Sequence, residues 1–402
     1  MSEGKKVPKI RFAGFTDAWE QRKLGDCFAE RVESMPDGEL ISVTINDGIK
    51  KFFELGRHDN SNDDKSKYKK VCVGDIAYNS MRMWQGASGY SPYEGIVSPA
   101  YTVLSPNSGI NSKCLAYQFK LPEMIHTFQV NSQGITSDNW NLKYPALSQI
   151  EIFVSKDERE QAKIAEYFEN LDNLITLHQN KHEKLVVLKK AMLEKMFPQK
   201  GNNVPEVRFA GFTGLWEKRK LREVVKEITR TAPESNAPIM MISANNGFIE
   251  QSERYAFNNA GDSLKKYILL EKGELAYNHG ASKLRPYGSC FALTTVENAR
   301  IPFVYHCFSV EEQNAEFMSI ELNGSDVENQ LRRIVSSSAR MDGLLNISFE
   351  EYTSISVLLP KIEEQNRIAD YFRNLDHLIT LQQRKCESLK HVKAALLQKM
   401  FV

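Results

Sequence analysis

The sequence lacks any long hydrophobic run. None of its apolar stretches reaches the eighteen or so residues that a membrane-spanning helix needs. Its first residues, Met-Ser-Glu-Gly-Lys-Lys, lack the apolar core of a secretion signal. We therefore expect a cytoplasmic chain that makes no membrane contact.

Cysteine is sparse, and neither positive nor negative charge predominates. Six cysteines are scattered along the chain with no CxxC pair, which predicts reduced thiols rather than disulfides or a metal site. The net charge is +1 overall, and by segment it is +1 for residues 1–156, 0 for 157–200, −3 for 201–359 and +3 for 360–402. A nucleic-acid contact must then come from local patches or be shared with partners.

Motifs for several chemistries are also missing. The chain has no NPPF-like or DPPY-like methyltransferase tetrad and no GxxxxGK[ST] phosphate loop. No Ser-His-Asp or Cys-His set can be assigned from spacing. We therefore expect a non-catalytic protein.

The sequence does contain an internal repeat that covers most of its length. "VPKIRFAGFTDAWEQRKLGD" from Val7 matches "VPEVRFAGFTGLWEKRKLRE" from Val204 at 13 of 20 positions. The segment from Glu160 to Phe197 matches that from Glu364 to Phe401 at 23 of 38 positions. Between them, "GDIAYN" ending at Asn79 parallels "GELAYN" ending at Asn278. Three collinear matches indicate a duplicated unit, whose halves we call the first and second copy.

Each copy has two parts with different patterns of apolar and turn residues. Its first 150 or so residues mix short apolar runs, such as "GIVSPAYTVL" and "TSISVLLP", with turn residues, and they predict a mixed α/β (α+β) domain with a small sheet. The last forty residues predict one long helix of roughly 57 Å. Ser155 as N-cap with Glu158 forms a capping-box pattern for the first helix, and Pro198 ends it.

The two long helices carry a heptad-like apolar seam. The seam consists of Leu171, Leu174, Leu185, Leu188 and Met192 in the first helix and Leu375, Leu378, Leu389, Val392 and Leu396 in the second. So narrow an apolar face needs a partner helix. The chain order favours an antiparallel pair of coiled-coil helices that separates two related globular domains with pseudo-two-fold symmetry.

The predicted domains are residues 1–156 and 201–359, and the predicted spacer helices are residues 157–200 and 360–402. Two related domains on one spacer suit an extended target read at two places, such as DNA, whose major groove returns to one side every 34–36 Å or so. After the shared Tyr-Asn the copies diverge. The first divergent loop, Ser80–Ser91, reads "SMRMWQGASGYS", and the second divergent loop, His279–Cys290, reads "HGASKLRPYGSC".

These residues resemble a known family. The repeated "VPxxRFAGFTxxWExRKL", the "GDIAYN"/"GELAYN" stretch and the twin "YFxNLDxLITLxQxK" helices are similar to the specificity (S) subunits of Type I restriction–modification systems, over nearly the whole chain. The resemblance implies two target-recognition domains that read a bipartite double-stranded DNA site. It also implies two methylation (M) subunits docked on the spacer and restriction (R) subunits joined to them. S-adenosylmethionine, ATP and Mg would then act in the partner subunits, and this chain would hold no cofactor.

Candidate DNA contacts follow from side-chain chemistry. Arg suits guanine edges and Asn or Gln suits adenine, whereas Lys and Arg also hold phosphates. The candidates for base contacts are Arg82, Gln85, Lys283 and Arg285, with Asn79, Asn278 and His279 as weaker ones. The candidates for phosphate contacts are Lys65, Lys67, Lys69, Lys70, Lys265 and Lys266, and a further cationic stretch holds Arg332, Arg333 and Arg340.

Other interpretations of these residues stay open. Asn79 and Asn278 are shared by both copies, which favours a turn-capping role. His178 and His182 have the spacing of zinc ligands, but the second copy has Gln382 and Cys386 there, so we expect no metal. For the whole chain, the alternatives are a coiled-coil protein-interaction adaptor without DNA binding and a self-contained nuclease or methyltransferase.

Overall fold

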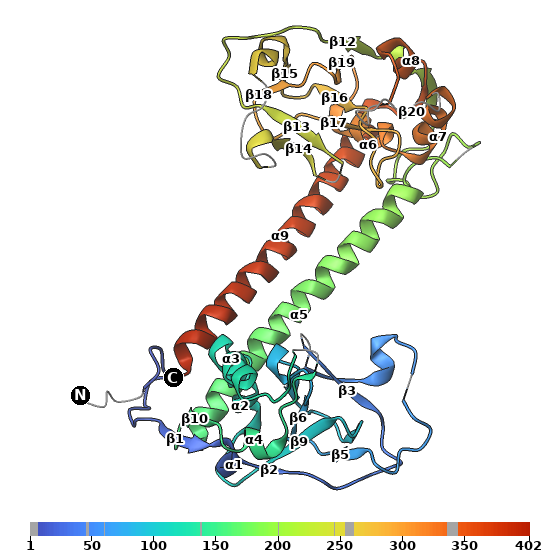
Figure 1. Ribbon diagram of the computed structural model, residues 1–402. Coiled ribbons are helices and arrows are strands. Elements are labelled where there is room, and N and C mark those ends of the chain that lie inside the picture. The colour runs from blue at the N-terminus through green and yellow to red at the C-terminus, as the bar shows by residue number, and fades with distance from the viewer. Residues whose placement is uncertain are drawn as a thin grey trace. The chain divides into compact units, whose positions relative to one another are not determined.

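The computed structural model describes residues 7–45, 48–59, 61–136, 139–199, 201–244, 246–253, 261–335 and 345–402. Its contacts divide the chain into two compact units. The first unit is Met1–Asn180 with Gln383–Val402, and the second is Lys181–Gln382. The long helices α5 (Glu158–Lys195) and α9 (Ile362–Met400) each contribute one part to each unit (Figure 1). Within the described ranges, no helix is both long enough and apolar enough to cross a membrane.

The first unit is built from short strands in small antiparallel sheets and short helices. Its elements are β1 (Glu20–Lys23), α1 (Leu24–Cys27), β2 (Phe28–Glu30), β3 (Ile41–Thr44), β4 (Gly48–Lys51), η1 (Phe52–Leu55), β5 (Lys69–Val71), β6 (Ile76–Asn79), η2 (Met83–Gln85), β7 (Ser88–Tyr90), β8 (Gly95–Val97), β9 (Tyr101–Pro106), α2 (Ser112–Gln118), α3 (Pro122–Val130), α4 (Tyr144–Leu147) and β10 (Glu151–Val154). The largest sheet has the order β2-β9-β6-β7, and β1 pairs with β10, β3 with β4 and β5 with β8.

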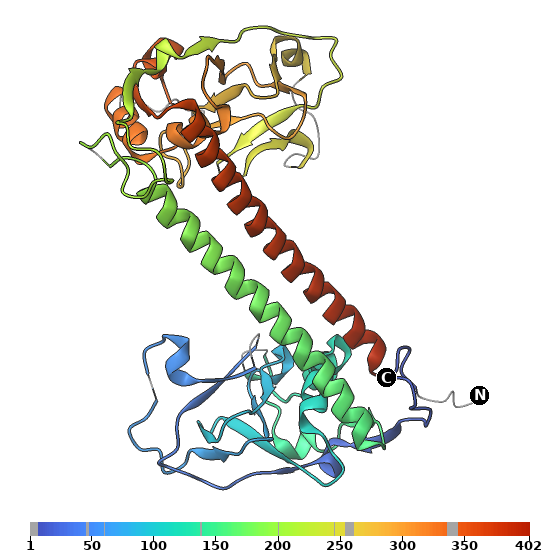
Figure 2. The same ribbon diagram turned by 180° about the vertical axis from the view of Figure 1, so that it is seen from behind.

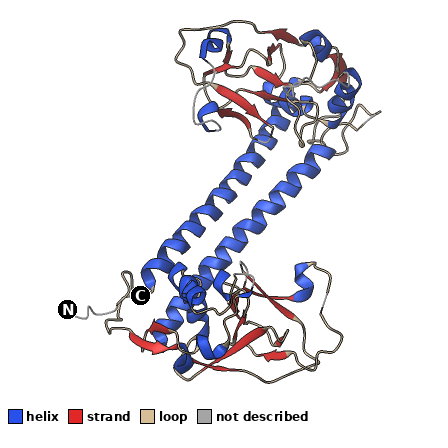
Figure 3. Cartoon of the chain, in the orientation of Figure 1, coloured by secondary structure: helices blue, strands red, loops and turns tan. Residues whose placement is uncertain are grey.

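The second unit repeats this topology strand for strand. Its elements are β11 (Glu217–Lys220), η4 (Leu221–Glu223), β12 (Val225–Glu227), β13 (Met240–Ser243), β14 (Gly247–Glu250), η5 (Gln251–Glu253), η6 (Gly261–Lys266), β15 (Ile268–Glu271), β16 (Leu275–Asn278), β17 (Ser289–Ala292), β18 (Asn298–Ile301), β19 (His306–Val310), α6 (Ala315–Leu322), α7 (Ser325–Ile334), α8 (Phe349–Thr353) and β20 (Ser356–Leu359). Its sheets are β12-β19-β16-β17, β11-β20, β13-β14 and β15-β18. The duplication predicted from sequence is therefore a duplication of fold, and the mixed α/β class is confirmed (Figure 3).

The opening segment of each copy packs against the ends of both long helices. In the first unit the Arg11 guanidinium makes a two-point ion pair with Glu160, whose side chain is fully buried at the start of α5. Ile10 N–H donates to the Lys399 carbonyl at the end of α9, at 2.9 Å. Trp19 packs edge-on against Phe401, with ring centroids 5.9 Å apart. Both views show the C-terminus beside the opening segment (Figures 1 and 2).

The second unit makes the same contacts with the helices exchanged. Arg208 pairs with Glu364 at the start of α9, at 2.6 and 2.7 Å. The N–H of Val207 donates to the carbonyl of Lys195, the last residue of α5, at 2.9 Å. Trp216 packs against Phe197 at 5.8 Å. The repeated opening segment, Ile10–Trp19 in the first copy and Val207–Trp216 in the second, thus joins the start of its own copy's long helix to the end of the other copy's long helix. We call this segment the clasp.

The helices run antiparallel within each unit. In the first unit Phe168 of α5 stacks on Phe401, and Asp172 pairs with Lys393, so the partner number falls as the α5 number rises. In the second unit Phe372 of α9 contacts Phe197, and Asp376 pairs with Lys189. The predicted antiparallel pairing is confirmed in each unit by these contacts.

The helix start and the seam differ in part from expectation. Helix α5 begins at Glu158, and the Asp157 carboxylate accepts the Arg159 N–H at 2.8 Å, so Asp157 takes the capping role predicted for Ser155. The Ser155 hydroxyl donates instead to buried Glu160.

Only part of the predicted seam is buried. Leu171 and Leu375 are 7% and 5% exposed, whereas Leu174, Leu188, Leu378 and Val392 are between 37% and 43% exposed. A pair of helices buries one narrow strip on each, which here includes Ile175 and Cys386, and leaves the flank of the heptad pattern in solvent.

Candidate nucleic-acid interface

The first divergent loop leaves the central sheet through a turn fixed by Asn79. Its side-chain oxygen accepts the N–H of Met81 at 3.0 Å. The next residue, Arg82, is exposed, and the Trp84 indole donates to the Met81 carbonyl at 3.0 Å. Trp84 also packs edge-on against Trp140, with centroids 5.2 Å apart. The loop therefore presents Arg82 from a rigid, aromatic-backed turn.

Gln85 holds an unused acceptor. Its side-chain oxygen is buried and has no hydrogen-bond partner within the described part of the chain. A buried polar atom without a partner costs stability, of order 1–3 kcal/mol. Because this oxygen is buried, it is shielded from an incoming base in this conformation, and the base contact of Gln85 stays a prediction.

Lys120 anchors the first divergent loop and was not singled out by the sequence. Its ammonium donates to the Gly86 carbonyl at 2.6 Å and to the Ile45 carbonyl at 3.1 Å. Burial, with a smaller contribution from Lys393, lowers the pKa of Lys120 to about 8. A lysine between the apolar residues Phe119 and Leu121 is the only sequence signal for this role.

The lysines of "KSKYKK" divide into two pairs. Lys69 and Lys70, in β5, pair with Glu30 and Glu33 at 3.3 and 3.2 Å. Lys65 is half-buried and Lys67 is exposed on the turn before the strand. A lysine already neutralised by a carboxylate attracts a phosphate less strongly, so Lys65 and Lys67 are the better placed of the four.

The second divergent loop begins with the same turn. The Asn278 oxygen accepts the N–H of Gly280 at 2.9 Å, as Asn79 does for Met81. Lys283 is exposed. Arg285 donates to the Asn323 carbonyl at 2.7 Å, and burial lowers its pKa. Lys283 is thus the freer cation, and Arg285 also serves to hold the loop.

His279 is held inside the second unit. Its side chain is 7% exposed, and its two ring nitrogens lie 2.7 and 2.6 Å from the carbonyls of Leu345 and Val304. Its ring stacks on His306, with centroids 5.2 Å apart. In this conformation neither nitrogen is available to a base edge, and the contacts assign His279 a role in anchoring Leu345.

The remaining predicted cations lie on two helices. Lys265 and Lys266 end η6, and the Lys266 ammonium lies 5.9 Å from the centre of the Phe303 ring. Arg332 and Arg333 are exposed in the last turn of α7. Arg340 lies outside the described residues. All of these remain predictions, since no bound nucleic acid tests them.

Other site chemistry finds little support. All six cysteines are free thiols, and five of them are buried. Within the described ranges, no cluster of three or more His, Cys, Asp or Glu side chains could hold a metal ion.

Comparison with known proteins shows a similarity to Type I specificity subunits. Residues 16–186 match the family model "Type I restriction modification DNA specificity domain". A curated relative, the Type I restriction enzyme MjaVIII specificity subunit of Methanocaldococcus jannaschii, is 23% identical over 94% of this chain and 91% of its own length. The chain is thus similar to Type I specificity subunits, in residues 16–186 by the family model and over most of its length by this relative.

A solved Type I specificity subunit has a similar fold. The structure of a Type I restriction–modification system S subunit from M. genitalium aligns with a TM-score of 0.55 at 15% identity, and it covers 98% of this chain and 99% of that one. At that identity the likeness concerns the fold alone.

Proposed function

We propose that this chain is the sequence-specific DNA-recognition subunit of a Type I restriction–modification complex, and that it reads an asymmetric bipartite site with one half-site per copy. One observation carries the proposal. The loops after β6 and β16 leave equivalent strands through the same Asn turn and then differ in every exposed cation and aromatic. A shared frame with unlike loops suits two readers of two different sequences.

The two long helices would dock two methylation subunits, with restriction subunits joined to the complex. Exposed apolar residues support this. In the first unit Leu174 and Val392 lie next to the Asp172–Lys393 ion pair along their helices, and in the second unit Leu188 and Leu378 lie next to Lys189–Asp376. These positions are equivalent in the repeat, so each unit offers the same apolar pair, which suits two copies of one partner.

The chemistry would belong to those partners. Methyl transfer with S-adenosylmethionine, and cleavage and translocation with ATP and Mg, need motifs that this sequence lacks. The chain itself would be a non-catalytic reader and scaffold, and its partners would act on a base flipped out of the duplex.

Methylome sequencing of cells that express the assembled complex tests the proposal. The wild-type chain should give one bipartite motif. Arg82→Ala should relax one block of that motif and Lys283→Ala the other, because each lies in one divergent loop. If both substitutions relax the same block, or if the wild-type complex methylates no defined sequence, the assignment of one half-site per copy fails.

The competing function is a protein-interaction adaptor that does not bind DNA. It predicts that the purified complex fails to retain duplex DNA at low salt, whatever the sequence.

The near-neutral net charge of the chain leads to a further expectation about DNA affinity. The chain alone should bind DNA weakly, and partners should steepen the dependence of affinity on salt because they neutralise further phosphates.

A further inference from the structure

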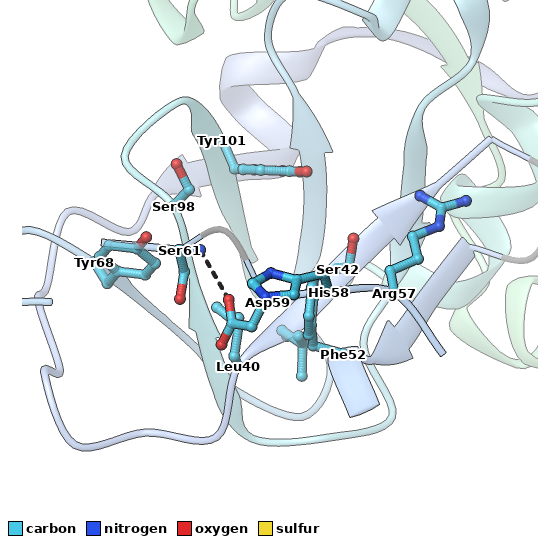
Figure 4. A pocket seen from close by; sticks show the side chains of 11 residues that line it. Leu40, Ser42, Phe52, Arg57, His58, Asp59, Ser61, Tyr68, Ser98 and Tyr101 are labelled. Atoms are coloured by element: carbon cyan, nitrogen blue, oxygen red, sulfur yellow. Dashed lines mark hydrogen bonds between the residues drawn. The ribbon is translucent and has the colours of Figure 1, made fainter. Parts of the chain in front are cut away.

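The first unit contains a cavity that the divergent loop does not account for. It has a volume of about 420 Å³ and is open to solvent. Its lining comes from β3, from η1 and the segment that follows it, from the residue before β5, and from the β8–β9 turn with the first residue of β9. This volume lies in the range of sites for small ligands, about 300–1,000 Å³. Figure 4 shows Tyr101 across the hollow from His58 and Asp59, with Tyr68 to one side.

The cavity lining includes residues next to two elements that the sequence predicts to contact DNA. Tyr101 pairs across β6–β9 with Asn79, the residue from which the first divergent loop departs. Tyr68, which also lines the cavity, belongs to "KSKYKK" and follows Lys65 and Lys67. The cavity thus adjoins both predicted contact elements through residues of its own lining.

The lining combines aromatic faces with unused polar groups. Tyr68 is 5% exposed, and Phe52 and Tyr101 are half-buried in the lining. Among the described residues, neither the Arg57 guanidinium nor the Tyr101 hydroxyl has a hydrogen-bond or ion-pair partner. Aromatic walls stack on bases, and such stacking is worth roughly 1–3 kcal/mol per base.

The cavity lining also contains a carboxylate, which can accept hydrogen bonds. The Asp59 side chain accepts the Ser61 N–H at 2.8 Å, and hydrogen bonds from Ser61 hold the pKa of Asp59 below its usual value. Asp59 is therefore ionised at neutral pH and can accept from an exocyclic amino group, while Arg57 can donate to a ring nitrogen or carbonyl. A phosphate alone would not suit a site whose rim carries this carboxylate.

We propose that the cavity receives a single nucleobase of the first half-site, stacked against Tyr101 and Phe52 and read by Asp59 and Arg57. The proposal rests on the DNA-recognition function above and deepens it. It adds a second reading point in the first copy, beside the divergent loop. The segment equivalent to the cavity rim in the second copy runs through residues 254–260, which lie outside the described residues.

The test uses the assembled complex and duplexes that carry its methylation motif, each with one position randomised. Asp59→Asn and Arg57→Gln should each reduce discrimination at the same single position of the first half-site, by about 5- to 150-fold. All other positions, and the second half-site, should keep their preference. Glu54→Gln is the matched control, since it removes the same charge from the neighbouring η1 turn outside the cavity lining.

A second measurement separates base insertion from surface contact. An abasic nucleotide at that position should weaken binding to the wild-type complex and to Tyr101→Phe, which keeps the ring. The same abasic nucleotide should have little effect on Tyr101→Ala, which has already lost the stacking wall. Competition with free deoxynucleoside monophosphates should leave DNA binding unchanged; displacement by them would assign the cavity to a free nucleotide and overturn the proposal.

The outcomes also distinguish this proposal from the function on which it rests. If the wild-type complex prefers no sequence, the DNA-recognition function itself fails. If the wild type has its bipartite preference and Asp59→Asn and Arg57→Gln keep it at every position, only the cavity assignment fails. An equal loss of affinity on all sequences would make the cavity a phosphate contact and would also overturn it.

Discussion

Asp172 and Lys393, which lie 221 positions apart in the chain, form an ion pair at 2.5 Å that joins the start of one long helix to the end of the other. The second unit forms its counterpart between Asp376 and Lys189 at 2.6 Å. Both carboxylates and both lysines occupy equivalent positions of the repeat, at an offset of 204. The duplication therefore specifies the register of the antiparallel pair twice, once in each unit.

This ion pair predicts a charge-swap result. Asp172→Lys or Lys393→Asp alone should lower the free energy of unfolding, by about 0.5–1 kcal/mol, because each places like charges side by side at a partly exposed site. The double variant should recover most of the loss. Urea unfolding of the full chain measures all three. Additive losses in the double variant would mean that the contact does not contribute.

Breaking the ion pair of the clasp should cost more stability than breaking the Asp172–Lys393 pair. Glu160→Gln removes the partner of a nearly buried arginine, and breaking such a pair costs roughly 3–5 kcal/mol. The combined variant Arg11→Met with Glu160→Gln removes both charges, keeps an acceptor for the Ser155 hydroxyl, and should be more stable than Glu160→Gln alone. Calorimetric melting temperatures give the comparison, and Glu158→Gln, in the exposed first turn of α5, serves as control.

Glu321 predicts a pH dependence of stability. Burial raises its pKa to about 7 from 4.5, and the Asp326 charge adds to the rise, whereas the hydrogen bond that the carboxyl accepts from the Leu358 N–H opposes it. The folded state therefore holds the proton more tightly than the unfolded state. The contribution to stability is fully present below pH 4.5 and is lost as the pH rises through 7, for a total of roughly 3 kcal/mol.

The repeat itself supplies the variant that tests this. Gln118 occupies the equivalent position of the first copy and donates to the Phe153 carbonyl at 3.1 Å. Glu321→Gln should remove the fall in unfolding free energy between pH 4.5 and 7 and leave a protein that is more stable at pH 8. Exposed Glu350→Gln should keep the wild-type pH profile. A profile that is the same in all three proteins would contradict the prediction.

Lys67 and Arg82 predict two different kinds of DNA defect. Both are exposed, but Lys67 lies on the turn before β5 and Arg82 in the first divergent loop. Lys67→Gln should weaken the complex equally on all sequences and reduce the salt slope by about 1. Arg82→Ala should weaken the specific site by about 1–3 kcal/mol and leave nonspecific binding nearly unchanged. Titrations at several salt concentrations, on motif and scrambled duplexes, separate the two.

Much of the architecture could be predicted from the order of residues. The matches at Val7 and Val204 and along α5 and α9 predict a repeated domain with a repeated helix, because a local pattern of apolar residues determines element type. The strands predicted within "GIVSPAYTVL" and "TSISVLLP" are present as β8, β9 and β20. The turn role weighed for Asn79 and Asn278 is what their side chains perform.

Other features depended on contacts between residues far apart in the chain. The sequence identified the repeated Arg11 and Arg208 but could not say that each meets a buried glutamate about 150 positions later. It gave no signal that Lys120 holds the first divergent loop or that His279 is enclosed by the segment at Leu345. It also could not say which half of the heptad seam would face solvent.

The sequence by itself determined the duplication, the element types and the divergence of the two loops, since these are local patterns repeated at a fixed spacing. Only the tertiary structure decided which side chains remain available to a ligand. A cation or amide is free for DNA only if no distant carbonyl or carboxylate already holds it, and that depends on where the folded chain places its partners.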